Sequence, residues 1–225
     1  MTPLNDGQQA TPFQFREAGS RGSAAYYLHP AAEALFPAIQ PGMRVLDVGC
    51  GNGYWAGWFV ERGCRVVGLD PSPSGIQVAR EAVPPARFEE AVVTTDTLAQ
   101  LGEDPFDLVV SFEVVEHVYS PKTWAQGCFS ALKPGGMLVC STPYHGYLKN
   151  LALAVTGKWD HHHQPLNEGG HIKFWSVPSL SRQLEEVGFR DVRFQGAGRY
   201  PGLWKSMVLA ARRPGLSAIS PKSLE

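Results

Sequence analysis

The feature that most constrains this chain is a strand-like run that leads directly into alternating glycines. Residues 44–48 read RVLDV, a short apolar run typical of a buried strand. Gly49, Gly51 and Gly53 follow, and then an apolar pattern with helical spacing. Because glycine lacks a Cβ, such a loop can turn sharply and let a ligand lie against the backbone. The segment therefore predicts a strand, a ligand-binding loop and the start of a helix.

A second strand pattern, residues 65–70, also ends on an acid, Asp70. In nucleotide-binding α/β folds an acid at this place accepts hydrogen bonds from both ribose hydroxyls. The loop spacing is G-x-G-x-G, whereas dinucleotide sites use G-x-G-x-x-G. Asp47 precedes the loop, and no basic residue lies in it. An acid beside the loop suits a cationic ligand, and S-adenosylmethionine (SAM) carries a sulfonium and an amino group.

The block D-x-G-x-G-x-G together with Asp70 resembles the class I SAM-dependent methyltransferases. The resemblance implies a Rossmann-like α/β fold with a mostly parallel seven-stranded sheet, helices on both faces and a lid insertion after the fifth strand. It implies that Asp70 holds the ribose and that Glu90 or its neighbours contact the adenine. The full set of expected cofactor-binding residues is Asp47, Gly49, Gly51, Gly53, Asp70, Pro71, Glu90 and Ser111. The alternative is a glycine-rich turn in another kind of α/β protein.

Strand and helix patterns alternate along the chain, which predicts a mostly parallel sheet with helices on both faces. Strands are expected at residues 44–47, 65–70, 86–90, 106–111, 136–142, 189–197 and 204–212. Helices are expected at residues 24–35, 54–61, 74–82, 95–101, 121–132, 147–155 and 177–187. Residues 133–136, KPGG, predict a turn between helix and strand, because proline stops a helix and glycines permit the turn.

The length of 225 residues is enough for one α/β domain with a substantial core. We expect this domain at residues 23–212, after a flexible segment at 1–22 and before a tail at 213–225. Residues 143–175 form a long connection rich in aromatic and histidine residues. Long connections in compact domains are usually functional or disordered, and this one is too apolar for disorder. It is predicted to be a lid.

The bulk composition narrows the classes of partner. The formal net charge of −1 provides no basic field for a nucleic acid, so we expect a small-molecule acceptor and no nucleic-acid partner. Four scattered cysteines without a C-x-x-C pair are typical of reduced thiols in a cytoplasmic protein. A signal-peptide pattern is not found, and the longest apolar run, residues 151–155, is too short to span a membrane. The oligomeric state is left open.

A second group of chemically active residues follows the fourth expected strand. If the chain turns helically there, Glu113, Glu116 and His117 share one helix face at positions i, i+3 and i+4. Two carboxylates and an imidazole can hold a divalent ion, and oxygen-rich ligation favours Mg²⁺ or Mn²⁺ over Zn²⁺. His171, in the expected lid, could close on the same ion. The alternative is structural, since acids in a first helical turn complement the helix dipole.

A narrower resemblance supports the metal interpretation. E-x-x-E-H, the K-P-G-G turn, a Ser-Thr strand end and a G-H-x-K-F segment resemble the ubiquinone-biosynthesis O-methyltransferases. This resemblance implies that Glu113, Glu116 and His117 are magnesium-binding residues. The small-RNA 2′-O-methyltransferases have a similar E-x-x-E-H with a later histidine, which His171 matches. The basic RNA-binding surface of those enzymes is missing here, so only the metal is carried over.

Other residues have weaker patterns. His145 could act as general base or as a hydrogen-bonding strut, so the expected catalytic residues are Glu113, His117 and His145. Residues 161–163 are three histidines, for which a solvated loop is favoured over a metal site. Residues 147–159 combine lysines with leucines. We expect them to pack over the site, although the narrower resemblance leaves a weak association with a membrane surface open.

The sequence therefore predicts a SAM-dependent methyltransferase for a small molecule. The expected acceptor is a hydroxyl of a phenolic, catechol or polyketide-like compound, and Mg²⁺ or Mn²⁺ assists if the metal site exists. Methyl transfer from a sulfonium mainly requires alignment and exclusion of water. The alternatives are a metal-independent N- or S-methyltransferase of a small metabolite and a SAM-binding module without catalysis.

Overall fold

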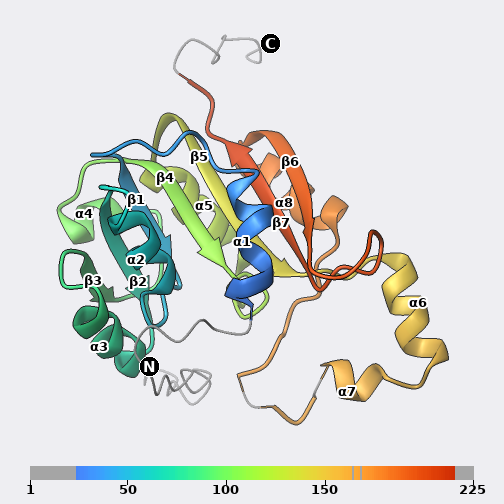
Figure 1. Cartoon of the computed structure of the whole chain (residues 1–225). Helices are drawn as coiled ribbons and strands as arrows, with labels where there is room; N and C mark the ends of the chain where they lie inside the picture. The colour runs from blue at the N-terminus through green and yellow to red at the C-terminus, as the bar shows by residue number, and fades with distance from the viewer. Residues whose placement is uncertain (1–23, 164, 168, 216–225) are drawn as a thin grey trace, which may run out of the picture.

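The computed structural model describes residues 24–163, 165–167 and 169–215, and it shows one seven-stranded sheet with helices on both faces (Figure 1). The strands are β1 Arg44–Val48, β2 Arg65–Asp70, β3 Arg87–Glu90, β4 Phe106–Phe112, β5 Leu132–Pro143, β6 Arg190–Ala197 and β7 Ser206–Arg212. Their order in the sheet is β3-β2-β1-β4-β5-β7-β6. The first five strands are parallel, and β7 is antiparallel to both β5 and β6. The predicted mostly parallel, seven-stranded sheet is confirmed.

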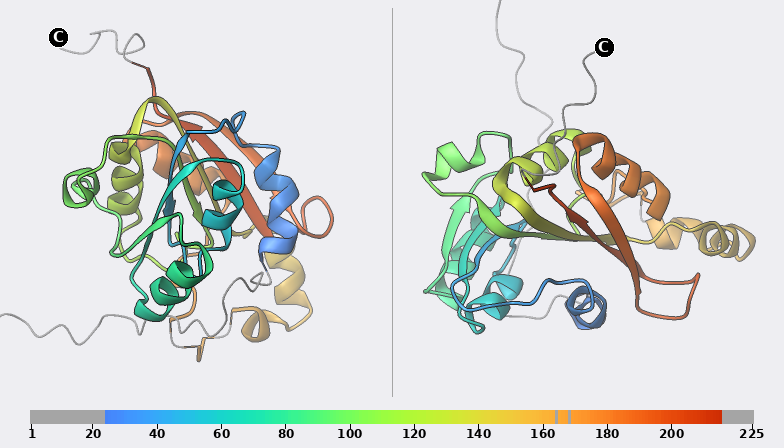
Figure 2. Two further views of the ribbon diagram at one scale, coloured as in Figure 1. Left: turned by 60° about the vertical axis from the view of Figure 1, so that its left-hand side comes forward. Right: turned by 90° about the horizontal axis from the view of Figure 1, so that it is seen from above.

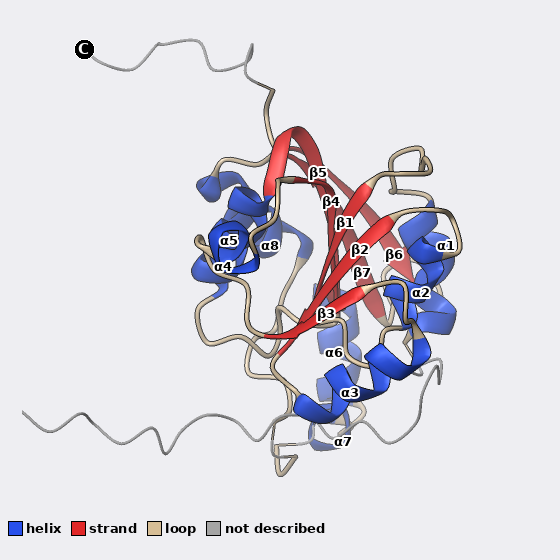
Figure 3. Ribbon diagram, turned by 90° about the vertical axis from the view of Figure 1, so that its left-hand side faces the viewer, coloured by secondary structure: helices blue, strands red, loops and turns tan. Residues whose placement is uncertain are grey.

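Each face of the sheet is covered by its own set of helices, as Figure 3 shows with the sheet nearly edge-on. One set is α1 Ala25–Glu33, α2 Tyr54–Val60 and α3 Pro73–Ala82, and the other is α4 Thr97–Leu101, α5 Pro121–Ala131 and α8 Val177–Val187. Phe59 of α2 is fully buried in the first core, and Leu180 of α8 in the second. Burial on both faces explains why the central strands read as continuous apolar runs.

Local capping chemistry fixes where several helices begin. Ser72 and Ser120 each precede a proline, and each hydroxyl accepts a hydrogen bond from a first-turn amide of α3 or α5. Ser176 and Ser179 form a capping box at the start of α8, which ends at Gly188 in the left-handed conformation. These are the residue types that satisfy free amides and carbonyls at helix ends.

The expected turn at residues 133–136 differs in the structure. Phe106 pairs with Leu132, but Leu108 pairs with Met137, so the residues in between bulge out of β5. Gly135 has φ +84°, which a glycine adopts without strain. Strand β5 therefore begins at Leu132, earlier than predicted, and contains the turn as an irregularity.

After β5 the chain leaves the sheet and forms α6 Tyr147–Val155 and α7 Trp159–His163 beyond the strand ends (Figures 1 and 2). Lys149 is buried, whereas Tyr147, Leu148 and Val155 are 80, 62 and 79% exposed. The exposed apolar side chains contradict close packing of α6 over the site. Movement of residues 143–175 as a lid stays a prediction.

The predicted segment 1–22, and all of the predicted tail beyond residue 215, lie outside the described residues. Within the described part of the chain, every helix is too short or too polar to cross a membrane.

Candidate functional site

The glycine loop lies at the carboxyl end of β1, where the strand order reverses between β1 and β4. Gly49, Gly51 and Gly53 have φ angles of +76°, +50° and +80°, which glycine adopts readily and other residues rarely. The amide of Gly49 donates to the Leu69 carbonyl at 2.7 Å. A Cβ at Gly49 would collide with the Val114 side chain. The loop is therefore bare backbone by necessity, and Gly53 is the N-cap residue of α2.

Two acids lie beside this loop. The Asp70 carboxylate accepts hydrogen bonds from the amides of Gly51 at 2.9 Å and Ser72 at 2.8 Å. Burial raises the pKa of Asp70, although these two hydrogen bonds oppose the shift. Asp47 is 2% exposed, and burial together with the charge of Asp70 raises its pKa to about 7. Two desolvated carboxylates beside bare backbone fit a cationic, ribose-containing ligand such as SAM.

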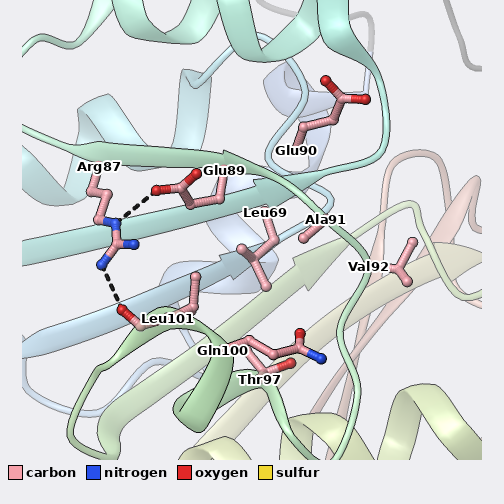
Figure 4. A pocket seen from close by; sticks show the side chains of 9 residues that line it. All are labelled: Leu69, Arg87, Glu89, Glu90, Ala91, Val92, Thr97, Gln100 and Leu101. Carbon is pink, nitrogen blue, oxygen red and sulfur yellow. Dashed lines mark hydrogen bonds and ion pairs between the residues drawn. The ribbon is translucent and has the colours of Figure 1, made fainter.

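The other expected cofactor residues are more scattered. Glu90 ends β3 in register with Asp70, and Pro71 follows Asp70; both are exposed. A hollow of about 200 Å³ lies next to β2 and β3. In the close-up of its lining residues, the Glu90 carboxylate is turned away from Thr97 (Figure 4). Ser111 is fully buried and its hydroxyl accepts a hydrogen bond from Trp124 Nε1 at 3.2 Å. Cofactor contacts of these three residues remain predictions.

The helical arrangement considered for Glu113, Glu116 and His117 is wrong. Residues 113–120 contain no helix, and Glu113 has φ +56°, a left-handed conformation that starts a turn. The amide of Glu113 donates to the Ser141 carbonyl at 3.1 Å, so contact with β5 fixes this conformation. The carboxylate accepts hydrogen bonds from the hydroxyls of Ser141 at 2.8 Å and Ser206 at 3.2 Å.

Glu116, His117 and His171 come together, because residues 169–173 lie against this turn. The amides of Ile172 and Lys173 donate to the Glu116 carbonyl at 2.9 and 3.0 Å. One potential ligand atom from each of Glu116, His117 and His171 lies within 4.8 Å of the other two. Thus three of the four expected metal ligands form a group, and Glu113 is bonded to the two serines instead.

Burial makes the two carboxyl groups of this region weaker acids than usual. Burial raises the pKa of Glu113 to about 7 and, with the nearby charge of Glu113, raises the pKa of Glu116 well above its usual range. Glu116 is 0% exposed, and neither carboxylate oxygen has a hydrogen-bond partner among the described residues. A buried acid without partners is costly, so this group is suited to a ligand that supplies them.

A second histidine group differs from the sequence expectation. His162 and His163 belong to α7 and are half-buried beside His145, so they are not in a solvated loop. His145 is 8% exposed and contacts Phe174 at a ring-centroid distance of 5.1 Å. Sequence reasoning missed this group because no local pattern links residue 145 to residues 162 and 163.

Three further polar residues support the site without a sequence signal. The Tyr27 hydroxyl lies 3.1 Å from Ser206 Oγ, which in turn donates to Glu113. Burial, with the charge of Glu113, raises the pKa of Tyr27 to about 12. Lys149 Nζ donates to the Tyr144 carbonyl at 2.8 Å, and burial lowers the Lys149 pKa to about 8.

A methyltransferase domain family matches residues 21–193, which include the glycine loop, Asp70 and the Glu116 group. The chain belongs to the SAM-dependent methyltransferases. It is 34% identical over 174 residues to a ubiquinone biosynthesis O-methyltransferase of Cereibacter sphaeroides, covering 76% of this chain and 69% of the relative. A relative with the same name from a Methylobacterium species is 32% identical over 208 residues, with 83% and 79% covered.

Solved structures agree on the fold. A SAM-dependent methyltransferase from Mesorhizobium loti aligns with TM-score 0.65 and 22% identity, covering 83% of this methyltransferase and 97% of that chain. The 1,6-didemethyltoxoflavin N1-methyltransferase of Burkholderia thailandensis aligns with TM-score 0.61 and 21% identity, covering 83% and 78%. The expected fold and enzyme class are confirmed, whereas the roles of individual site residues remain predictions.

Proposed function

We propose that this methyltransferase transfers a methyl group to a hydroxyl of a small phenolic, catechol or polyketide-like acceptor, with a divalent ion bound by Glu116, His117 and His171. The proposal rests on the convergence of His171 with Glu116 and His117 of the turn after β4. This turn lies close to the predicted cofactor loop, because Val114 is the side chain that a Cβ at Gly49 would meet. The relatives named as O-methyltransferases support the choice of oxygen.

The residues present fit a metal ion. The Nδ1 atom of His117 lies 3.0 Å from the Gly169 carbonyl, so it carries the proton and leaves Nε2 free as a ligand. Burial, with the neighbouring His117, lowers the pKa of His171 to about 4, which keeps its imidazole neutral. Two imidazoles and one carboxylate form a mixed donor set, which favours Mn²⁺ over Mg²⁺. A bound cation would lower the pKa of a coordinated hydroxyl.

The protein's own contribution is positioning and proton management. SAM supplies a methyl group on a good leaving group, so alignment and exclusion of water provide most of the catalysis. Of the two candidate bases, Glu113 has a pKa of about 7 and His145 of about 4. A base works best with a pKa near the working pH. We therefore assign the role of general base, which accepts the proton of the acceptor hydroxyl, to Glu113 in preference to His145.

The test is methyl transfer from labelled SAM to catechols, phenols, amines and thiols, with and without EDTA. Activity on a hydroxyl should disappear in EDTA and return with Mn²⁺. Glu116→Gln should reduce turnover at least about 100-fold, since even outer-shell changes cost 10- to 100-fold. SAM affinity should be unchanged. Glu185→Gln, at an exposed acid on α8, is the matched control.

Three results would contradict parts of the proposal. Full turnover in EDTA would show that the reaction needs no metal ion. Methylated product only from amines or thiols would indicate the N- or S-methyltransferase alternative. Tight SAM binding without any methylated product would indicate a SAM-binding module.

We also propose weak association with a membrane surface. Tyr147, Leu148 and Leu151 of α6 are 80, 62 and 47% exposed, and Tyr200 in the β6–β7 connection is 78% exposed. Apolar side chains of this kind can enter the boundary between head groups and acyl chains. Sedimentation with anionic lipid vesicles should be reduced by the pair Leu148→Ser and Leu151→Ser. Equal sedimentation of the wild type and the pair would contradict this proposal.

A further inference from the structure

The histidine group formed by His145, His162 and His163 is separate from the Glu116 group. One ring nitrogen from each residue lies within 4.8 Å of the other two. The ring centroid of His145 is 5.9 Å from that of His162 and 5.5 Å from that of His163. The ring centroids of His162 and His163 are 4.9 Å apart. Three imidazoles from two separate segments thus lie close enough together to bind one ion.

These imidazoles lack the partners that buried polar groups normally have. Both ring nitrogens of His145, and Nε2 of His163, are buried without a hydrogen-bond partner among the described residues. Leaving a buried donor or acceptor unsatisfied costs about 1–3 kcal/mol. The cluster therefore indicates a ligand that accepts several nitrogen lone pairs at once.

The three rings lie in largely apolar surroundings. His145 is buried, and His162 and His163 are half-buried. Phe174 packs against His145 and His163, and the ring centroid of Trp159 lies 4.3 Å from that of His163. The neutral imidazole, which binds metals, has a free lone pair on one nitrogen.

We propose that His145, His162 and His163 bind a zinc ion. Three imidazole ligands and one open position form a common zinc arrangement, and imidazole suits Zn²⁺ better than Mg²⁺ or Ca²⁺. The Oδ1 atom of Asn150 is also buried without a partner among the described residues. We assign it as the acceptor for the N–H of the His145 ring nitrogen that does not bind the metal, in the supporting role that carboxylates and carbonyls usually have.

Other charged or titratable groups near this site must be compatible with a cation. The Lys149 ammonium opposes positive charge at all three histidines, and its Nζ donates to the carbonyls of Tyr144 and Lys205. Burial lowers the pKa of Lys149 to about 8, so this ammonium loses its proton more readily than that of an exposed lysine. Asp160 favours positive charge at His163, whereas Arg199 and His171 oppose it at His162.

A zinc ion at this place would connect two parts of the chain after β5. His145 is anchored, since its amide donates to the Trp175 carbonyl at 3.0 Å. His162 and His163 belong to the peripheral helix α7. Zinc would therefore fix α7 against the start of α6 and the carboxyl end of β5, and would set the position of residues 144–163 without contacting the cofactor loop.

The test is calorimetric titration of the metal-stripped full chain with Zn²⁺, and visible absorption with Co²⁺ as a probe of nitrogen ligation. We expect the wild type to bind one Zn²⁺ ion at this site. In His163→Ala and in His145→Ala the Zn²⁺ affinity of this site should be at least about 100-fold weaker than in the wild type, because even outer-shell changes cost 10- to 100-fold. His161→Ala is the matched control, since His161 is an exposed neighbour on the same helix and lies outside the group.

The Glu116→Gln, His171→Ala double variant separates this site from the one proposed for catalysis. It should keep the zinc-binding event and the Co²⁺ spectrum that depend on His163. Circular dichroism and SAM binding of each variant would show that the chain remains folded. Equal Zn²⁺ affinity in wild type and His163→Ala would overturn the proposal, as would an equal loss in His161→Ala.

Discussion

The glycine-loop region and the histidine-rich segment after β5 are built in opposite ways. In the first, Asp47, Gly49 and Asp70 lie at the ends of central strands, and short backbone hydrogen bonds fix them. In the second, the described residues between 144 and 175 lie beyond the strand ends, α6 has one buried residue, and α7 has none. The first region is held by the core of the domain, whereas the second is held by few buried side chains and by separate hydrogen bonds, such as that from the His145 amide to the Trp175 carbonyl.

This difference separates two tasks. Binding a constant cofactor requires one unchanging backbone shape, which a core strand and a glycine loop provide. Acceptor recognition benefits from a segment that can change without disturbing the core. We infer that substitutions in the first region affect stability and SAM together, whereas those in the second affect acceptor and metal.

The largest expected contrast is between two glycines with positive φ. Gly49→Ala should destabilise the protein by about 2–5 kcal/mol, because left-handed strain adds to a collision with Val114. Gly157, at φ +64°, has open space among the described residues, so Gly157→Ala should cost at most about 1–2 kcal/mol. Urea unfolding measures both. Equal destabilisation by the two substitutions would show that the glycine loop is no more constrained than the segment after β5.

Asp70→Ala should weaken SAM affinity by about 1.5–3 kcal/mol, or about 10- to 150-fold, because a charge-assisted acceptor is lost. It also removes the acceptor for the amides of Gly51 and Ser72. Calorimetry should show no such effect for Glu61→Ala, an exposed acid after α2. Unchanged SAM affinity in Asp70→Ala would exclude the assigned role.

SAM affinity should depend on pH through Asp47, whose pKa is about 7 because of burial and the charge of Asp70. A cationic ligand prefers the ionised carboxylate, so affinity should fall by up to about tenfold per pH unit below 7. Asp47→Asn should abolish this dependence. A SAM affinity of the wild type that does not change with pH would show that the positive charge of SAM lies away from Asp47.

The same pKa predicts the opposite trend for the ligand-free fold. A carboxyl with a raised folded-state pKa stabilises the protein fully below its unfolded value, near 4, and this contribution is lost as the pH rises through about 7. Asp47→Asn should therefore raise the unfolding free energy more at pH 8 than at pH 5. Denaturation at both pH values checks the sign.

The smallest expected effect concerns motion of the second region. Amides of the described residues between 144 and 175 should exchange more slowly when SAM and an acceptor are bound, because a lid orders on closure. Amides of β1 should not change. Strong protection of both regions without ligand would show that residues 144–175 are fixed.

The sequence predicted the first region well, because its signals are contiguous. Asp47, the glycines and Asp70 lie within two strands and one loop, so local patterns describe them fully. The alternation of strand and helix patterns also predicted the sheet. The start of β5 was not predicted, because the bulge in this strand depends on its pairing with β4.

The turn after β4, which carries Glu113 and Glu116, and the second region were predicted only in part. A helical face for Glu113 and Glu116 failed, because contacts of Glu113 with Ser141 on β5 hold a left-handed residue at the turn. His171 does lie next to Glu116, as the family resemblance implied, and metal binding by the two residues stays a prediction. The grouping of His145 with α7 was missed, because spatial contacts between distant residues leave no periodic pattern.

The hydrogen bonds from Tyr27 through Ser206 to Glu113 have a consequence for the order of folding. During synthesis, the strands that present the cofactor loop emerge long before β7, the last strand along the chain. Domains generally fold as units, with earlier segments waiting for later ones. The acceptor side of the site is therefore completed only when β7 inserts between β5 and β6. A chain interrupted before Ser206 would carry the cofactor loop and Ser141, but would lack the second of the two hydroxyls that donate to the Glu113 carboxylate.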